Sequence, residues 1–336
     1  MITVVIPLYN KAPYLQRALD SVYTQTAPAD EILVVNDGST DGGGQIAHAQ
    51  IDPRVRVNDQ PNQGVSAARN RGIAAATQPF LAFLDADDWW LPGYLGRIRE
   101  MIEAHPGAAL YGTGFATARA DQIVRSYGVR LRGADSQTGF GLVDYFRSAT
   151  GRLVICASSM VVPKATALAV GGFPVGVPLA EDHEFWARLA LQGRFALAPE
   201  PLTRYDVGVP GQATTYWQTG YKTQFDILPY HRFLASEWHG MSRQAARRRN
   251  GFVSFCRHEL ATALLQRLYW NRFDAAEAFC RELHLETLPA GCRLRFGRWL
   301  AAHRCAQAAW RGLMRVARFL RTRGTRGRRG TAIHAA

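Results

Sequence analysis

The sequence is poor in cysteine and has no long apolar run. Only five of its 336 residues are cysteines, and no two of them form a C-x-x-C pair. This odd number and wide spacing argue against a disulfide framework or a zinc site, so we expect reduced thiols. No stretch reaches the ~18 apolar residues that a membrane-spanning helix needs. The N-terminal run MITVVIPLYN lacks the charged segment and cleavage site of a signal peptide, which predicts a cytoplasmic protein.

Lysine and acidic residues are scarce in the last third of the chain. Residues 241–336 contain 20 Arg, no Lys and five acidic residues, a net charge of +15. Residues 1–240 carry 20 basic and 22 acidic residues, a net charge of −2. The positive charge therefore belongs to a separate region: residues 216–320 are predicted to form a helical, Arg-rich extension, and residues 321–336 are predicted to be disordered.

Within that extension, apolar residues recur at helical spacing from Trp299 to Leu320, and Arg304, Arg311, Arg315 and Arg318 fall on another face. The pattern favours a helix that lies on an anionic surface at the inner face of the membrane. A helix packed on the rest of the protein, with its arginines in water, fits equally well. Nucleic acid ranks last and is not expected as a partner, because no motif that reads DNA or RNA accompanies the arginines.

Short β-branched runs alternate with helical patterns along the chain. The predicted buried strands are Ile2–Pro7, Glu31–Asn36 and Phe80–Leu84, with a weaker strand at 54–57. Apolar positions at helical spacing predict helices over residues 13–24, 64–76, 94–104 and 181–193. This alternation predicts an α/β fold with a mostly parallel sheet.

Polar residues follow each strand: Tyr9-Asn10, Asp37-Gly38 and Asp85–Asp88. Because ligands bind beyond the carboxyl ends of parallel strands, we expect these residues to converge on one site. The segment DGSTDGG at 37–43 has neither the GxGxxG order of a dinucleotide site nor the GxxxxGK[ST] of a P-loop. Asp37 could instead accept a hydrogen bond from a base or a ribose, although the same residue types also favour an ordinary turn.

Asp85-Ala86-Asp87 places two carboxylates two residues apart. In an extended segment both would face one ligand, and Mg²⁺ or Mn²⁺ takes a few carboxylate oxygens together with substrate phosphates. The alternative is that these aspartates cap the helix that follows. Glu181-Asp182 is open in the same way: one carboxylate could act as a general base, or the pair could simply cap a helix.

Five segments occur in a fixed order: VVIPLYN, ILVVNDGSTD, NQGVSAARNRG, FLAFLDADD and AEDHEFWARL. Over roughly residues 1–206 the chain therefore resembles the inverting family 2 glycosyltransferases of the nucleotide-diphospho-sugar transferase superfamily. The resemblance implies the GT-A fold, a Rossmann-like, mostly parallel sheet flanked by helices, here followed by the helical C-terminal extension. It also implies a nucleotide-sugar-binding half at 1–105 and an acceptor-binding half of the same domain at 106–215.

The resemblance further implies roles for individual residues. Asp182 would be the catalytic base, with Glu181 as the weaker candidate, and Asp87 would bind Mn²⁺ or Mg²⁺ directly. The residues that would line the nucleotide site are Pro7, Tyr9, Asn10, Asp37, Gly38, Asn62, Gly64, Arg69, Asn70, Asp85 and Ala86. Those expected on the acceptor side are Phe173, His183 and Trp186.

The implied reaction transfers a sugar from a nucleoside-diphosphate donor, with UDP favoured, to a hydroxyl of a glycan or lipid-linked acceptor. One carboxylate base would distinguish it from glycoside hydrolysis, where two carboxylates flank the bond, and single displacement predicts inversion. The competing hypotheses are a nucleotidyltransferase, whose usual basic Gly-rich loop is missing from VVIPLYNKAPY, and a non-enzymatic adaptor that uses the basic tail. One departure is the segment LTRYDVG at 202–208, which has an acid where the family commonly has a base.

Overall fold

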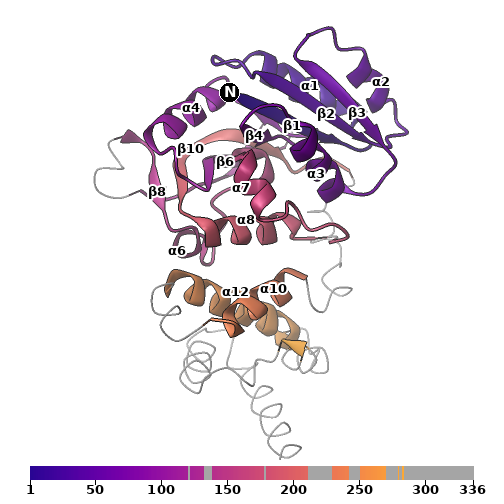
Figure 1. Cartoon of the computed structure of the whole chain (residues 1–336). Coiled ribbons are helices and arrows are strands. Elements are labelled where there is room, and N and C mark those ends of the chain that lie inside the picture. The colour runs from indigo at the N-terminus through magenta and orange to yellow at the C-terminus, as the bar shows by residue number, and fades with distance from the viewer. Residues whose placement is uncertain are drawn as a thin grey trace, which may run out of the picture. The chain divides into compact units, whose positions relative to one another are not determined.

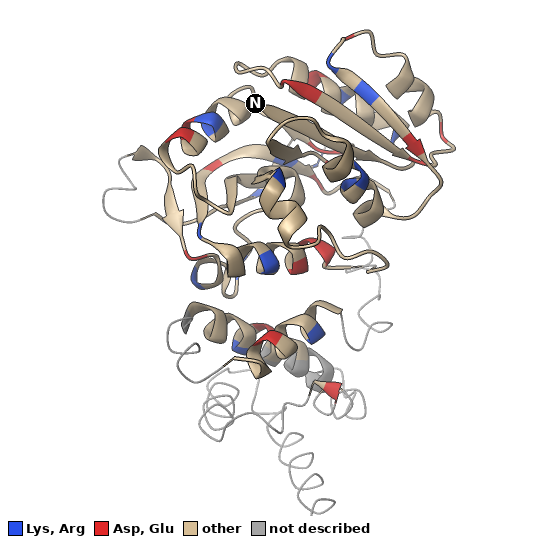
Figure 2. Cartoon of the chain, viewed as in Figure 1, with Lys and Arg blue, Asp and Glu red and all other residues tan. Residues whose placement is uncertain are grey.

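The computed structural model describes residues 1–119, 122–131, 138–177, 179–210, 229–241, 250–269, 279 and 282–283. The chain forms two compact units, Met1–Lys222 and Thr223–Ala336, and Figure 1 shows the elements of each. Acidic and basic residues are interspersed over the first unit (Figure 2), in line with the nearly neutral charge of residues 1–240. Both predicted halves, 1–105 and 106–215, lie within the limits of the first unit, and the boundary between them stays a prediction.

One ten-stranded sheet runs through the first unit in the order β3-β2-β1-β4-β9-β6-β10-β5, with β7 paired to β6 and β8 to β10. Its N-terminal part is parallel: β1 (Ile2–Leu8) lies between β2 (Glu31–Asp37) and β4 (Phe80–Phe83), and β2 pairs with β3 (Val55–Gln60). All residues of β1 and β2 are buried, as expected of parallel strands covered on both faces. The β-branched runs therefore form the predicted strands.

The C-terminal part of the sheet is mixed. β9 (Met160–Pro163) runs antiparallel to both β4 and β6 (Leu110–Arg119), whereas β10 (Phe195–Asp206) runs parallel to β6. The short strands at this end all pair antiparallel: β5 (Trp89–Trp90) and β8 (Gly141–Val143) with β10, and β7 (Gln122–Tyr127) with β6. The sequence pattern did not predict that the strand next to β4 on this side, β9, would be antiparallel to it.

Helices flank the sheet on both faces. α1 (Ala12–Tyr23) buries Leu15 and Leu19 in the cluster that contains the even-numbered residues of β1. On the other face α3 (Val65–Ala75) packs closely, since a Cβ at Gly72 would come within 2.2 Å of Val5. The other described helices of the unit are α2 (Gly43–His48), α4 (Tyr94–Ala104), α6 (Tyr145–Ala149), α7 (Lys164–Ala169), α8 (Glu181–Gln192) and the 3-10 helix η1 (Ala157–Ser159). The four predicted helices are confirmed to within one residue at each end.

The second unit contains two described helices, α10 (Pro229–His239) and α12 (Asn250–Tyr269). They touch where the thiol of Cys256, a buried residue, lies 3.8 Å from Leu234 O. None of the helices in the described ranges combines the length and apolarity needed to cross a bilayer. Cys156 and Cys256 are free thiols. The other cysteines, the amphipathic helix expected at 299–320 and the tail at 321–336 lie outside the described residues.

Candidate active site

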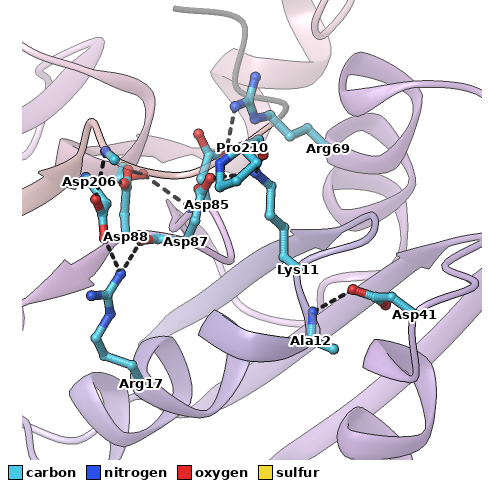
Figure 3. Close-up of polar contacts among 12 residues, drawn as sticks. Lys11, Ala12, Arg17, Asp41, Arg69, Asp85, Asp87, Asp88, Asp206 and Pro210 are labelled. Carbon is cyan, nitrogen blue, oxygen red and sulfur yellow. Dashed lines mark hydrogen bonds and ion pairs between the residues drawn. The ribbon is translucent and has the colours of Figure 1, made fainter. Parts of the chain in front are cut away.

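The carboxyl ends of β1, β2 and β4 meet at one edge of the sheet, as the strand pattern predicts. Asn10, after β1, contacts the loop after β2: its N–H donates to Ser39 Oγ at 3.2 Å, and its Oδ1 accepts from the Thr40 N–H at 2.8 Å. Lys11 then reaches the turn after β4, where its Nζ lies 2.9 Å from Asp87 Oδ2 (Figure 3). Three segments that are distant in the sequence therefore converge.

The residues after β1 present an aromatic ring at this edge. Asn10 adopts a left-handed backbone with a φ of 51°, a conformation that asparagine tolerates better than most residues. Tyr9 before it is 46% exposed, whereas Pro7 is buried within β1. An exposed ring beside polar strand ends can stack on a nucleotide base, so the part predicted for Tyr9 is compatible with its position.

Asp37, at the end of β2, is 2% exposed and holds the loop that leads to α3. Its two oxygens accept hydrogen bonds from the N–H groups of Gln63 at 2.9 Å and Gly64 at 2.8 Å, and from a glutamine side chain of β3. Gly38 has a φ of 73°, and a Cβ there would lie 2.9 Å from the Asn62 nitrogen, so this position requires glycine. A carboxylate can accept about four hydrogen bonds, so Asp37 has room for one beyond these three. A hydrogen bond from a base to Asp37 stays a prediction.

Asp85 to Asp88 form a tight turn, because the Asp88 N–H donates to Asp85 O at 2.9 Å. The expectation of an extended segment was therefore wrong, because a fully extended backbone cannot form a hydrogen bond between residues three positions apart. Asp87 follows the buried Ala86 within the turn. The alternative of helix capping is also wrong, because the N-cap of α4 is Gly93 and no side chain caps it. The carboxylates of Asp85 and Asp87 thus remain candidates for ligand binding.

Asp88 is fully buried and fastens the turn to β10. Its carboxylate accepts hydrogen bonds from the Ser158 hydroxyl and, at 3.0 Å, from the Asp206 N–H. Burial raises the pKa of Asp88 well above its usual value, and the charges of Asp87 and Asp85 act in the same direction. Asp88 therefore supports the turn from the interior of the protein.

The acid at position 206, where the family commonly has a base, has a basic partner. Arg17 of α1 donates through Nη2 to Asp206 Oδ2 at 2.8 Å and to Asp87 O at 2.7 Å (Figure 3). Its guanidinium also lies 3.9 Å from the centre of the Trp89 ring. A charge-assisted pair and a cation–π contact from one side chain hold the end of β10 against the turn. The acid at this position is thus paired within the structure.

Arg69 of α3 lies between the two carboxylate groups of the site. Its side chain is 3% exposed, with Nη2 at 2.7 Å from Asp85 Oδ1 and Nη1 at 3.0 Å from Glu181 Oε1. Burial alone would lower the pKa of Arg69, but these carboxylates raise it above its usual value. Next to it, Asn70 Nδ2 donates to Phe173 O and Asn70 Oδ1 accepts from the Phe173 N–H, both at 2.8 Å. Both side chains thus join α3 to the region of α8. Contacts of Arg69 and Asn70 with a nucleotide stay a prediction.

The first turn of α8 carries Glu181 and Asp182. Its N-cap is Ala180, so the reading of these two acids as N-caps is wrong. Burial and the charge of Asp182 raise the pKa of Glu181, while Arg69 acts against them. Within the described parts of the chain, no side chain forms a hydrogen bond or ion pair with Asp182, whose Oδ1 accepts from the His183 N–H at 2.8 Å. Since Glu181 is held by Arg69, Asp182 is the better placed of the two to receive a proton.

Two residues expected on the acceptor side lie in the core. Phe173 is 1% exposed and stacks on Phe185 with 4.0 Å between ring centroids. Trp186 is 2% exposed, and its Nε1 donates to Met160 Sδ at 3.0 Å. His183 is partly exposed, and its ring centroid lies 5.0 Å from that of Trp186. Any effect of Phe173 or Trp186 on an acceptor would therefore act through packing.

The turn after β4 fits a divalent cation by the chemistry of its donors. Asp85 and Asp87 supply the hard oxygen ligands that Mg²⁺ and Mn²⁺ prefer, and these ions are usually held by one or two carboxylates plus substrate phosphates. The described residues contain no group of three or more His, Cys, Asp or Glu that could hold a metal by itself. Water, or phosphate oxygens of a donor, would thus have to complete the coordination.

Sequence reasoning missed Lys11, Arg17 and Ser158. Lys11 directly follows Tyr9-Asn10 past the end of β1, so the strand-end rule that selected those two residues could also have selected it. Arg17 and Ser158 reach the site from within α1 and η1. The direction in which a helical residue faces depends on packing, and the sequence carries no signal for that.

The fold is the expected GT-A fold, as the likeness to two solved structures shows. The structure resembles that of S. aureus TarS 1–349 in complex with UDP-GlcNAc, with a TM-score of 0.65 and 17% identity over 84% of this chain and 81% of that one. It also resembles the mannosyltransferase PcManGT from Pyrobaculum calidifontis in complex with GDP-Man and Mn²⁺, with a TM-score of 0.53 and 20% identity over 94% and 85% of the two chains. The expected fold is therefore confirmed.

Residues 3–153 match the family model for Glycosyl transferase family 2, so this part of the chain is a family 2 glycosyltransferase domain. The glycosyltransferase EpsJ of Bacillus subtilis (strain 168) is 36% identical over 124 residues, which make up 36% of this chain and 36% of that protein. The match thus spans little more than a third of this relative's length. The match covers the first four of the five ordered segments that carry the resemblance, and AEDHEFWARL at 180–189 lies beyond it.

Proposed function

We propose that the protein is a metal-dependent, inverting glycosyltransferase that moves a sugar from a nucleoside-diphosphate donor to a hydroxyl of a glycan or lipid-linked acceptor. One observation carries the proposal. The buried side chain of Arg69 forms an ion pair with Asp85 on one side and with Glu181 on the other. Two structural neighbours, one in complex with UDP-GlcNAc and one in complex with GDP-Man and Mn²⁺, support a nucleotide sugar and a divalent cation as ligands. UDP remains the favoured nucleotide.

On the donor side, Tyr9 would stack on the base and Asp37 would accept a hydrogen bond from it. Asp87 would hold the divalent cation, with Asp85 beside it on the same turn. When bound, that cation neutralises negative charge that develops on the departing diphosphate. Asp88, which is buried, and Arg17 hold the turn in place. The oxygens of Asp85 and Asp87 therefore need little reorganisation when charge develops.

On the acceptor side, Asp182 would take the proton of the acceptor hydroxyl as its oxygen attacks the anomeric carbon. The bond from that carbon to the diphosphate oxygen breaks, its electron pair leaves with the diphosphate, and one displacement inverts the configuration. A positioned general base contributes about 10²–10⁴-fold to such a rate. Arg69 would keep Glu181 paired, which holds the first turn of α8 next to the carboxylate turn, the turn formed by Asp85 to Asp88.

The test begins with thermal-shift screening of UDP-, GDP-, dTDP- and CDP-sugars with Mn²⁺, followed by turnover assays on the donor that binds. Asp87→Ala should abolish divalent-dependent donor binding and turnover. Asp182→Asn should bind the donor normally and lose about 10²–10⁴-fold in turnover. Asp20→Asn is the matched control, since this exposed carboxylate on α1 bonds Gln16. Retained turnover in both active-site variants would contradict the proposal, and release of pyrophosphate would indicate a nucleotidyltransferase.

The proposal extends to the place of the enzyme in the cell. We infer a cytoplasmic protein that meets an anionic membrane surface through its Arg-rich C-terminal region. The support is the net charge of +15 on residues 241–336, together with the amphipathic spacing between Trp299 and Leu320. Co-sedimentation with anionic vesicles tests this part separately from the chemistry.

A further inference from the structure

Lys11 holds the carboxylate that the proposed function assigns to the divalent cation. Its Nζ lies 2.9 Å from Asp87 Oδ2, and it also donates to Pro210 O at 3.2 Å (Figure 3). The two side chains of the ion pair are 16% and 10% exposed, so water screens the pair only partly. An ammonium group therefore lies against the oxygen where a metal ion is expected.

Each acid of the turn is balanced by a different group. Asp85 pairs with Arg69, and Asp88 is buried with hydrogen bonds from neutral donors. Asp87 pairs with Lys11. Three carboxylates within four residues repel one another unless such partners are present. Lys11 thus stabilises the turn.

An ammonium and a divalent cation cannot both lie close to the same carboxylate oxygen without strong repulsion. Cation binding at Asp87 Oδ2 therefore requires Lys11 to move away. The backbone next to it is held, because Asn10 is bonded to Ser39 and Thr40. Lysine can still move, since its charge sits on a flexible four-carbon stem. A lysine ammonium is also a common ligand of phosphate.

We propose that Lys11 is an exchangeable counter-ion of the donor site. In the donor-free protein it neutralises Asp87; when a divalent cation takes that carboxylate, the released ammonium binds the diphosphate of the nucleotide sugar. The inference rests on the proposed function, because it takes Asp87 as the cation ligand. It adds a positively charged group for the leaving diphosphate that the motif pattern did not identify.

The first experiment titrates MnCl₂ into the full-length, donor-free chain and measures free Mn²⁺ by electron paramagnetic resonance. Lys11→Met should bind Mn²⁺ about tenfold more tightly than the wild type, a size typical of coupling between neighbouring charged groups. Lys164→Met is the matched control: it removes the same charge, but the Lys164 ammonium is held by the carbonyls of Ala74 and Ala76. Asp87→Asn should lose the Mn²⁺ site.

The second experiment measures binding of UDP at saturating MnCl₂, or of another nucleoside diphosphate if the donor screen selects its base. Lys11→Met should bind it about tenfold more weakly, within the range of a charge-assisted contact. A misfolded variant cannot bind one ligand more tightly and another more weakly, so opposite signs support the exchange.

The outcomes separate the inference from the function on which it rests. If Asp87→Asn loses Mn²⁺ binding but Lys11→Met binds Mn²⁺ no more tightly than Lys164→Met, the inference is overturned and the cation role of Asp87 stands. If Lys11→Met binds Mn²⁺ more tightly but keeps wild-type affinity for the diphosphate, the exchange onto phosphate is overturned. If Asp87→Asn binds Mn²⁺ like the wild type, the assignment of the cation to Asp87 fails.

Discussion

Replacing Arg69 with methionine should destabilise the first unit by about 3–4 kcal/mol, in the lower part of the range for removing one partner of a buried ion pair. The side chain is 3% exposed, and its loss leaves Asp85 and Glu181 unpaired. Asp85 is 23% exposed and can regain water, whereas Glu181 at 15% exposed regains less. The Arg69 guanidinium lies 5.1 Å from the centre of the Phe173 ring. A methionine at position 69 keeps an apolar contact with that ring, so loss of packing adds little.

The measurement is equilibrium unfolding in urea, followed by tryptophan fluorescence and circular dichroism. Arg97→Met is the matched control, because Arg97 also bridges two acids, Glu100 and Glu200, but is 28% exposed. It should lose less than about 1 kcal/mol, as surface ion pairs do. Arg69→Met/Glu181→Gln should be more stable than Arg69→Met alone, with a coupling energy of about 1–3 kcal/mol in the double-mutant cycle.

The effect should also depend on pH with a defined sign. Arg69 lowers the pKa of Glu181 against the effects of burial and Asp182, so Arg69→Met raises that pKa further. A carboxyl whose pKa is higher in the folded state binds more protons when folded, and stability then falls as pH rises through that range. The gap between wild type and variant should therefore widen from pH 5 to pH 8. A loss no larger than that of Arg97→Met, with a gap independent of pH, would refute the role of Arg69.

Two further predictions concern the packing of α3 and the basic tail. Gly72→Ala should destabilise the protein, because overpacking against Val5 costs about 1–3 kcal/mol and the gain in helix propensity is at most ~1 kcal/mol; an unchanged melting temperature contradicts this, and Val5→Ala in the same chain should recover part of the loss. Deletion of residues 297–336 removes ten arginines and no acid. It should abolish co-sedimentation with phosphatidylserine vesicles while turnover on a soluble acceptor continues, and equal binding by the shortened chain would exclude the tail as the membrane contact.

The parallel half of the fold was predictable because its signals are local. β1, β2 and β4 are short β-branched or apolar runs, β3 alternates Val55 and Val57 with polar residues, and α1, α3 and α4 follow helical spacing. The antiparallel strand β9 was not predictable, because a run such as MVVP carries no signal for the direction in which it pairs. Its pairing with Phe80 to Ala82 depends on the path of the chain from residue 84 to residue 160. Periodicity fixes the type of an element better than the direction in which it pairs.

The candidate site was predictable as a set of strand ends but not as a network. The strand-end rule brought Tyr9, Asp37 and Asp87 to one edge, while the bond between Asp88 N–H and Asp85 O that turns their segment could not be read from the letters. The inward direction of Arg69 was hidden as well. An arginine in a helix usually faces water, and its burial here requires acids from two distant segments.

The contacts that complete the site join very distant positions: Lys11 to Pro210 across 199 residues, Arg17 to Asp206 across 189, and Asp206 to Asp88 across 118. During synthesis at ~5–20 residues per second, roughly 6–24 s separate the appearance of residues 90 and 210. Contacts of such high order also form late and slowly in folding. The nascent chain can thus pair its first four strands, yet it cannot fasten its carboxylate turn until the end of β10 has left the ribosome. Premature termination before that point would release a domain with β1 to β4 paired and its candidate site unfinished.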